Sequence, residues 1–132
     1  MSIVTGAATG IGQAIATGLA QEGASVVVAD LQLDKARETA NSIISAGGRA
    51  EAVKVDVSKV DEISAMVDQA VTRFGGVDIL VNNAGIFSVK PFLEMTEADW
   101  NRQIDINLKS VFFAIQKVAQ AMIDQGRAGR IV

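Results

Sequence analysis

The chain has 132 residues, of which 49% are hydrophobic and 20% are charged, and its formal net charge is −3. This length suits one domain with its own hydrophobic core and leaves no room for a second domain. A weakly acidic chain has no electrostatic basis for binding nucleic acid or an anionic membrane. The sequence contains no Cys and no His, which excludes disulfides, thiol catalysis, His-dependent triads and Cys- or His-ligated metals, so we expect no metal site.

The sequence shows no targeting or membrane-spanning pattern. No charged, then apolar, then small-residue leader opens the chain, and no apolar run reaches the ~18 residues that a membrane span needs. We therefore expect a cytoplasmic protein that has no membrane partner.

Short apolar runs alternate with longer segments of helical spacing from one end of the chain to the other. The expected strands lie at residues 3–4, 25–29, 50–57, 79–81 and 131–132. Most of these runs are β-branched and uniformly apolar, which is typical of strands buried on both faces of a parallel sheet. Glu51 and Lys54 interrupt the third run, which predicts an edge strand.

Helical spacing separates these runs over residues 11–19, 33–43, 60–74 and 100–122. Ser58 is the expected N-cap of the third helix. Thr96 and Asp99 resemble a capping box before the fourth helix, and Gly126 is expected to end it.

The alternation predicts right-handed βαβ units and a Rossmann-type α/β fold with a doubly wound parallel sheet. The sheet is expected to be incomplete, with about four and a half strands, because the fifth run has barely begun at Val132. A flavodoxin-like signalling domain shares this alternation. It needs clustered acidic residues at the end of the first strand, where this chain has Thr5 and Gly6.

A glycine-rich turn, Thr5-Gly6-Ala7-Ala8-Thr9-Gly10-Ile11-Gly12, follows the first strand. A tight reversal, an approach of bare backbone to a pyrophosphate, and close packing of a helix on the sheet each favour a residue without a Cβ. Free amides at the start of the next helix would then attract an anion. Glycines also mark ordinary tight turns, but a position between an apolar strand and a helix favours dinucleotide binding.

Asp30 ends the second strand, where a carboxylate can accept hydrogen bonds from both hydroxyls of an adenosine ribose and repel a 2′-phosphate. The alternative is a solvated Asp at the start of a loop. No Lys or Arg occurs among Ala7, Ala8, Thr9 and Leu31, where a cation for that phosphate is expected. The sequence therefore predicts NAD as the cofactor in preference to NADP, with no basic residue nearby.

The spacing of the turn glycines, TGxxxGxG, resembles that of the short-chain dehydrogenase/reductase family, and three further motifs match the family in the same order. They are Asp56-Val57 at the end of the third strand, Asn82-Asn83-Ala84-Gly85 at the end of the fourth, and Asn107 in the long helix. The resemblance covers the whole chain. It implies that residues 1–132 form an NAD(P)-binding Rossmann domain that ends before the family's catalytic Ser, Tyr and Lys.

The resemblance also implies roles for individual residues. Asp56 would recognise the adenine ring, or would only be a polar strand end, while Asn82 would tie neighbouring strands together. Asn107 is the one implied catalytic residue, since the family uses a kink there to hold a water in a proton relay; without the family it reads as a surface polar residue. The implied cofactor-binding residues are Gly6, Thr9, Gly10, Ile11, Gly12, Asp30, Leu31, Asp56, Val57, Asn83, Ala84 and Gly85.

The family resemblance predicts hydride transfer between a nicotinamide and a small alcohol or carbonyl substrate, performed by a homodimer or a homotetramer. The sequence contains no Tyr, so residues 1–132 alone are expected to bind the adenosine half of a dinucleotide weakly and to show no turnover. The alternative is a non-catalytic dinucleotide-binding module. An unpaired fifth strand and an uncovered apolar stripe through Phe112, Ile115 and Met122 predict poor solubility for these residues by themselves.

Overall fold

In the computed structural model, which describes all 132 residues, a five-stranded parallel sheet has the strand order β3-β2-β1-β4-β5. The strands are β1 (Ser2–Thr5), β2 (Ser25–Asp30), β3 (Arg49–Lys54), β4 (Ile79–Val81) and β5 (Arg130–Ile131). The chain builds outward from β1 to β3 and then crosses back to place β4 on the other side of β1. This reversal is the switch point of a doubly wound sheet, so the predicted Rossmann-type fold is confirmed.

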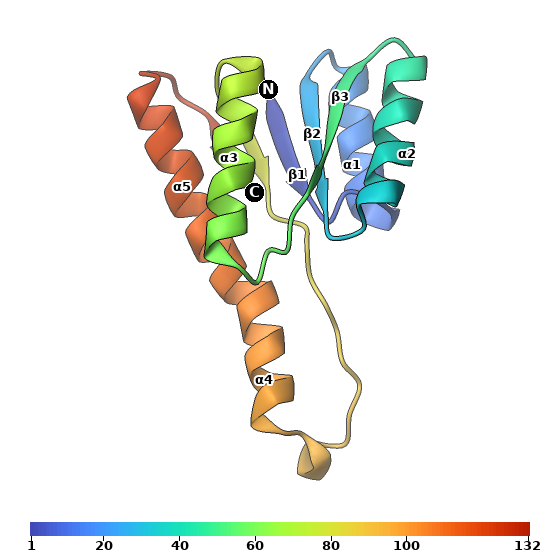
Figure 1. Cartoon of the computed structure of the whole chain (residues 1–132), viewed down its shortest axis with the longest axis vertical. Helices are drawn as coiled ribbons and strands as arrows, with labels where there is room; N and C mark the ends of the chain where they lie inside the picture. The colour runs from blue at the N-terminus through green and yellow to red at the C-terminus, as the bar shows by residue number, and fades with distance from the viewer.

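Two layers of helices cover the sheet (Figure 1). The helices are α1 (Gly10–Gln21), α2 (Leu33–Ser45), α3 (Val60–Phe74), α4 (Glu97–Ile104) and α5 (Ser110–Asp124). Helices α1 and α2 cover one face of the sheet, and α3 and α5 cover the other. Successive residues of a strand point to opposite faces, so Ile3 belongs to the core under α3 and α5, whereas Val4 belongs to the core under α1 and α2.

Strand β3 lies at the edge of the sheet, as predicted, but it ends at Lys54 and does not continue to Val57. The reason is a local turn at Asp56, whose Oδ1 accepts hydrogen bonds from the backbone N–H of Ser58 at 3.0 Å and from its hydroxyl at 2.7 Å. Such a side-chain turn competes with the extended backbone of a strand.

The prediction that Ser58 caps α3 is wrong. The N-cap is Lys59, which makes no side-chain capping hydrogen bond. Because the Ser58 hydroxyl donates to Asp56, it is directed toward the end of β3 and not toward the amides of α3.

The predicted long helix is divided into α4, a π-helical turn over Asp105–Lys109, and α5. The predicted capping box at its start is confirmed. The backbone N–H of Asp99 donates to the Thr96 hydroxyl at 3.2 Å, and the backbone N–H of Thr96 donates to Asp99 Oδ2 at 2.9 Å. Gly126 follows the end of α5 with a φ of 63°, a left-handed conformation that suits glycine.

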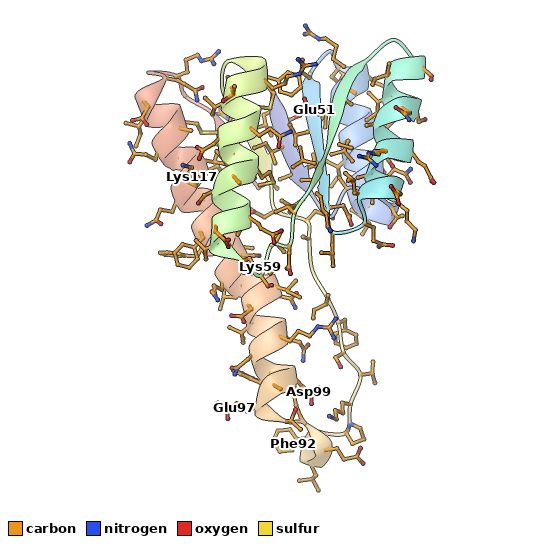
Figure 2. The ribbon with its side chains drawn as sticks, viewed as in Figure 1. Glu51, Lys59, Phe92, Glu97, Asp99 and Lys117 are labelled. Atoms are coloured by element: carbon orange, nitrogen blue, oxygen red, sulfur yellow. The ribbon has the colours of Figure 1, made fainter.

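The segment before α4 and α4 itself extend away from the sheet (Figure 1). Lys90 Nζ lies 2.5 Å from Asp99 Oδ2 and ties this segment to the start of α4, and Figure 2 shows Phe92 and Asp99 at the far end of the extension. The large apolar side chains exposed on this extension are Phe87, Val89, Phe92, Leu93 and Trp100. No helix of the chain combines the length and the apolar character that a membrane crossing requires.

The apolar stripe of α5 is only partly uncovered. Met122 is buried, whereas Phe112 is 61% exposed and Ile115 is 37% exposed. Strand β5 is the other edge of the sheet and pairs only with β4. The poor solubility expected of residues 1–132 by themselves stays a prediction.

The Asp99 carboxylate is expected to stabilise the extension in a pH-dependent way. The hydrogen bond from Lys90 first, and those from Thr96 next, lower the pKa of Asp99 well below its ordinary value. A lowered pKa in the folded state stabilises the fold above the unfolded pKa of about 3.9, and this stabilisation is lost as the pH falls toward the folded pKa. The difference in unfolding free energy between the wild type and Asp99→Asn should therefore be constant near neutral pH and shrink below about pH 4, as measured by urea denaturation. Lys90→Gln should remove the largest part of this pH dependence. If the difference in unfolding free energy between the wild type and Asp99→Asn grew on acidification, the lowered pKa of Asp99 would be contradicted.

Candidate functional site

A cavity of about 310 Å³ opens at the carboxyl ends of the parallel strands, beside the switch point of the sheet. The predicted residues that line it are Gly6, Thr9, Asp30, Leu31, Asp56, Val57, Asn83, Ala84 and Gly85. Four further lining residues were not predicted, namely Gln32, Val55, Ile86 and Ile106. The structure places the predicted Gly10, Ile11, Gly12 and Asn107 outside this lining.

The glycine turn brings bare backbone to one side of the cavity. Gly6 and Gly10 have φ values of 63° and 61°, in the left-handed region that L side chains rarely adopt. A Cβ on Gly10 would meet nothing within 4 Å, so the backbone there faces open space. A Cβ on Gly12 would lie 2.2 Å from the carbonyl oxygen of Gly6, so this glycine is required for the first turn of α1 to pack against the loop.

The start of α1 is open to an external hydrogen-bond acceptor. Thr9 is the N-cap, and its side chain makes no capping hydrogen bond. No acidic residue occupies the first turn. The amides of a helix start lack partners within the helix, and the helix dipole favours a negative charge beside them. This end of α1, next to Gly10, can therefore bind a phosphate group.

Asp30 both faces the cavity and holds the glycine turn. Its Oδ2 accepts the backbone N–H of Ala8 at 3.0 Å, and its Oδ1 accepts that of Gln32 at 2.9 Å. The carbonyl of Ala8 is held from the other side by the buried hydroxyl of Thr39, which donates to it at 3.0 Å. Sequence reasoning missed Thr39, because a Thr in the interior of an amphipathic helix gives no local sign of a partner in another loop.

Asp56 lies in a network that keeps its carboxylate ionised. The hydroxyl of Ser58 is the largest cause of the lowered pKa of Asp56. Burial opposes it to a lesser extent, and the backbone N–H of Ser58 and the charge of Lys59 add smaller lowering effects. The backbone N–H of Asp56 donates to Glu62 Oε2 at 2.7 Å, which is the largest cause of the lowered pKa of Glu62. Lys59 completes the network at 2.9 Å from Glu62 Oε1. Asp56 is therefore available as a hydrogen-bond acceptor at neutral pH.

The two asparagines after β4 hold the switch point together. Asn82 bonds to the residue that directly follows β5, since its backbone N–H and its side-chain Nδ2 donate to the main-chain oxygen of Val132 at 2.8 and 3.2 Å. Asn83 bonds to the glycine turn, since its Nδ2 donates to the carbonyls of Thr5 and Gly6 at 3.0 and 3.1 Å. Both side chains therefore have structural partners, and Asn83 also lines the cavity.

Asn107 lies in the π-helical turn between α4 and α5. Its Oδ1 accepts the backbone N–H of Ile86 at 2.8 Å, and its Nδ2 donates to the carbonyl of the same residue at 2.8 Å. This pair of hydrogen bonds resembles one rung of a β-ladder made by a side chain. Asn107 therefore positions the segment that leaves the cavity after Gly85.

Removing this side-chain pair should loosen the segment at Ile86. In Asn107→Leu both 2.8 Å hydrogen bonds are lost, and the amide of Ile86 should exchange with solvent about thirtyfold faster, because two net hydrogen bonds contribute about 1 kcal/mol each. Hydrogen–deuterium exchange followed by NMR measures this rate. Asn101→Leu, an exposed change on α4, is the matched control and should leave it unchanged. Equal protection of Ile86 in all three proteins would contradict this role of Asn107.

Charged side chains near the cavity complete the site. Lys54 on β3 is the register partner of Asp30 on the neighbouring strand β2. The expectation that no basic residue lies near Asp30 therefore holds for residues 7–9 and 31 but fails for β3. Sequence reasoning missed Lys54 because the two residues are distant along the chain.

No group of three or more His, Cys, Asp or Glu side chains is arranged to hold a metal ion.

Comparison with known proteins places the whole chain in one family. The family model for short chain dehydrogenases matches residues 1–132. The chain is 41% identical over 132 residues to 2-dehydro-3-deoxy-D-gluconate 5-dehydrogenase of Escherichia coli (strain K12), covering 100% of this chain and 51% of that protein. It is 42% identical over 132 residues to galactitol 2-dehydrogenase of Agrobacterium fabrum (strain C58), covering 100% of this chain and 50% of that protein.

A solved structure agrees with the same assignment. A metagenomic short-chain oxidoreductase in complex with NADP superposes with a TM-score of 0.92 at 39% identity, over 99% of this chain and 58% of that chain. The chain spans about half the length of the curated relatives that it matches. With a family model that covers every residue and a doubly wound sheet of the same architecture, the chain belongs to the short-chain dehydrogenase family.

Proposed function

We propose that the cavity holds the adenosine half of a nicotinamide dinucleotide, with NAD preferred over NADP, in an enzyme that transfers hydride between the cofactor and a small alcohol or ketone. The observation that carries the proposal is the meeting of three features at one cavity. An open helix start, a carboxylate at the end of β2 and an ionised carboxylate after β3 all lie at the carboxyl edge of the sheet.

The chemistry of these groups fits the parts of an adenosine dinucleotide. The backbone at Gly10 has the open space that a pyrophosphate needs, and the helix start supplies amides for it. Each oxygen of Asp30 accepts one backbone N–H and retains a free acceptor position, so both can accept ribose hydroxyls. Asp56 supplies the acceptor that the exocyclic amine of adenine requires.

The bound nicotinamide supplies the hydride chemistry, while the residues of this chain orient the cofactor and the loop beside it. Asn107 positions the backbone at Ile86, next to the segment of Asn83, Ala84 and Gly85 that lines the cavity. The chain contains no Tyr. We therefore assign the family's proton-transfer Tyr, with its Lys and Ser, to residues outside 1–132. The active protein is proposed to be a homodimer or a homotetramer.

Binding and turnover together test the proposal. Isothermal titration calorimetry of the purified protein should detect NAD binding, with weaker binding of NADP because Asp30 repels the 2′-phosphate. A screen of small polyols and ketones, run with protein that includes the residues assigned outside 1–132 and followed by the absorbance of NADH, should then find a substrate, whereas residues 1–132 alone should show no turnover. Absence of binding by either dinucleotide would overturn the proposal, whereas NAD binding without turnover of any substrate would favour a non-catalytic dinucleotide-binding module.

A further inference from the structure

A second depression lies at the connection from β2 to α2 and the first turn of α2. It measures about 520 Å³ and is lined by Leu31, Gln32, Leu33, Asp34, Lys35 and Lys54. Leu31 and Gln32 also line the cavity proposed to hold adenosine. The two hollows are therefore neighbours that share part of one wall, and Asp30, which lines the first hollow, directly precedes the two shared residues.

The register of the sheet directs Lys54 to the same side as Asp30. The two residues are Cα partners on the adjacent parallel strands β2 and β3. Strand residues two apart share a face, and Val26, Val28, Ala50 and Ala52 all pack against the core under α1 and α2. Asp30 and Lys54 continue these two rows, so the lysine leaves the sheet beside the carboxylate proposed to bind the ribose.

The lysines of this depression are free to meet an anion. Neither Lys35 nor Lys54 takes part in any salt bridge of the molecule. The acidic residue among the lining residues, Asp34, is paired with Arg37 at 3.3 Å. Asp30, which lines the neighbouring cavity, accepts the backbone N–H groups of Ala8 and Gln32 with its two oxygens.

We infer that Lys54, with Lys35, forms a phosphate subsite beside Asp30 that admits the 2′-phosphate of NADP. The inference rests on the proposed function, because the ribose must first lie at Asp30. Repulsion by Asp30 and attraction by Lys54 then act on the same phosphate from adjacent strands. Lys54 is thus a specificity-determining residue that limits how strongly the protein discriminates against NADP. Both interactions are partly exposed to solvent, so the affinity for the phosphorylated ligand should fall with salt.

Two small ligands that differ only in the 2′-phosphate isolate this subsite. Adenosine 5′-monophosphate and adenosine 2′,5′-bisphosphate are titrated calorimetrically into the wild type, Lys54→Gln and Lys35→Gln. Lys54→Gln should weaken binding of the bisphosphate about fivefold while changing binding of the monophosphate less than about twofold, since a charge-assisted hydrogen bond to the added phosphate is lost. Lys35→Gln should have an effect in the same direction.

Arg49→Gln is the matched control, because Arg49 also lies on β3 without a salt bridge but at the opposite end of the strand. It removes the same charge and should leave both affinities unchanged. Equal effects of Lys54→Gln and Arg49→Gln, equal weakening of both ligands, or no effect of Lys54→Gln would overturn the inference. Failure of the wild type to bind the monophosphate and NAD would instead overturn the proposed function, so the two failures are distinguishable.

Discussion

Replacement of Gly12 by alanine is expected to destabilise the protein strongly and to abolish most of its dinucleotide binding. The new Cβ would lie 2.2 Å from the carbonyl oxygen of Gly6 and 2.5 Å from Nδ2 of Asn83. Asn83 cannot move aside freely, because the same Nδ2 donates to Thr5 and Gly6. Overpacking of this kind costs about 1–3 kcal/mol, and backbone displacement adds to it, so we expect a loss of about 3 kcal/mol in the free energy of unfolding.

Urea denaturation and calorimetric titration with NAD measure the two effects. Gly18→Ala is the matched control, since Gly18 lies in the same helix α1 and a Cβ there would meet nothing within 4 Å. This change should stabilise the protein by about 0.5–1 kcal/mol, because alanine is the better helix former, and should leave NAD binding unchanged. If Gly12→Ala and Gly18→Ala changed the free energy of unfolding and the NAD affinity alike, the close contact at Gly12 would not be the reason for glycine at this position.

Replacement of Asp30 by asparagine should weaken NAD binding by about tenfold and shift the preference toward NADP. The amide can accept only one of the two backbone N–H groups, of Ala8 and Gln32, that the carboxylate accepts at 3.0 and 2.9 Å. It also removes the negative charge that opposes the 2′-phosphate. Calorimetric titration with NAD and NADP measures both affinities.

A second variant separates the two consequences of Asp30→Asn, which are the lost hydrogen bond to the glycine turn and the lost negative charge. Thr39→Val removes the hydrogen bond to the carbonyl of Ala8 at 3.0 Å, and therefore disturbs the same turn without changing a charge. It should weaken NAD and NADP alike, whereas Asp30→Asn should change their ratio. An unchanged ratio of the two affinities in Asp30→Asn would contradict the role given to this carboxylate.

Most of the fold follows from local sequence patterns. Apolar runs and helical spacing identify the strands and helices, because a buried parallel strand and an amphipathic helix each require a period that can be read from one segment. The capping box of Thr96 and Asp99 is found in the same way, since both partners lie within one turn. The end of β3 and the N-cap of α3 are predicted wrongly, because the hydroxyl of Ser58 has two possible partners and bonds to Asp56.

The sequence by itself determined the glycine turn, the acidic residues at strand ends and the parallel order of elements, since each depends on neighbours along the chain or on the general rule that parallel strands end at one edge. Only the tertiary structure decided which groups meet across that edge. The bonds of Thr39 to Ala8 and of Asn107 to Ile86, and the register of Asp30 with Lys54, join residues that are distant in the sequence. Such partners are chosen by the packing of whole elements, for which no single segment carries a signal.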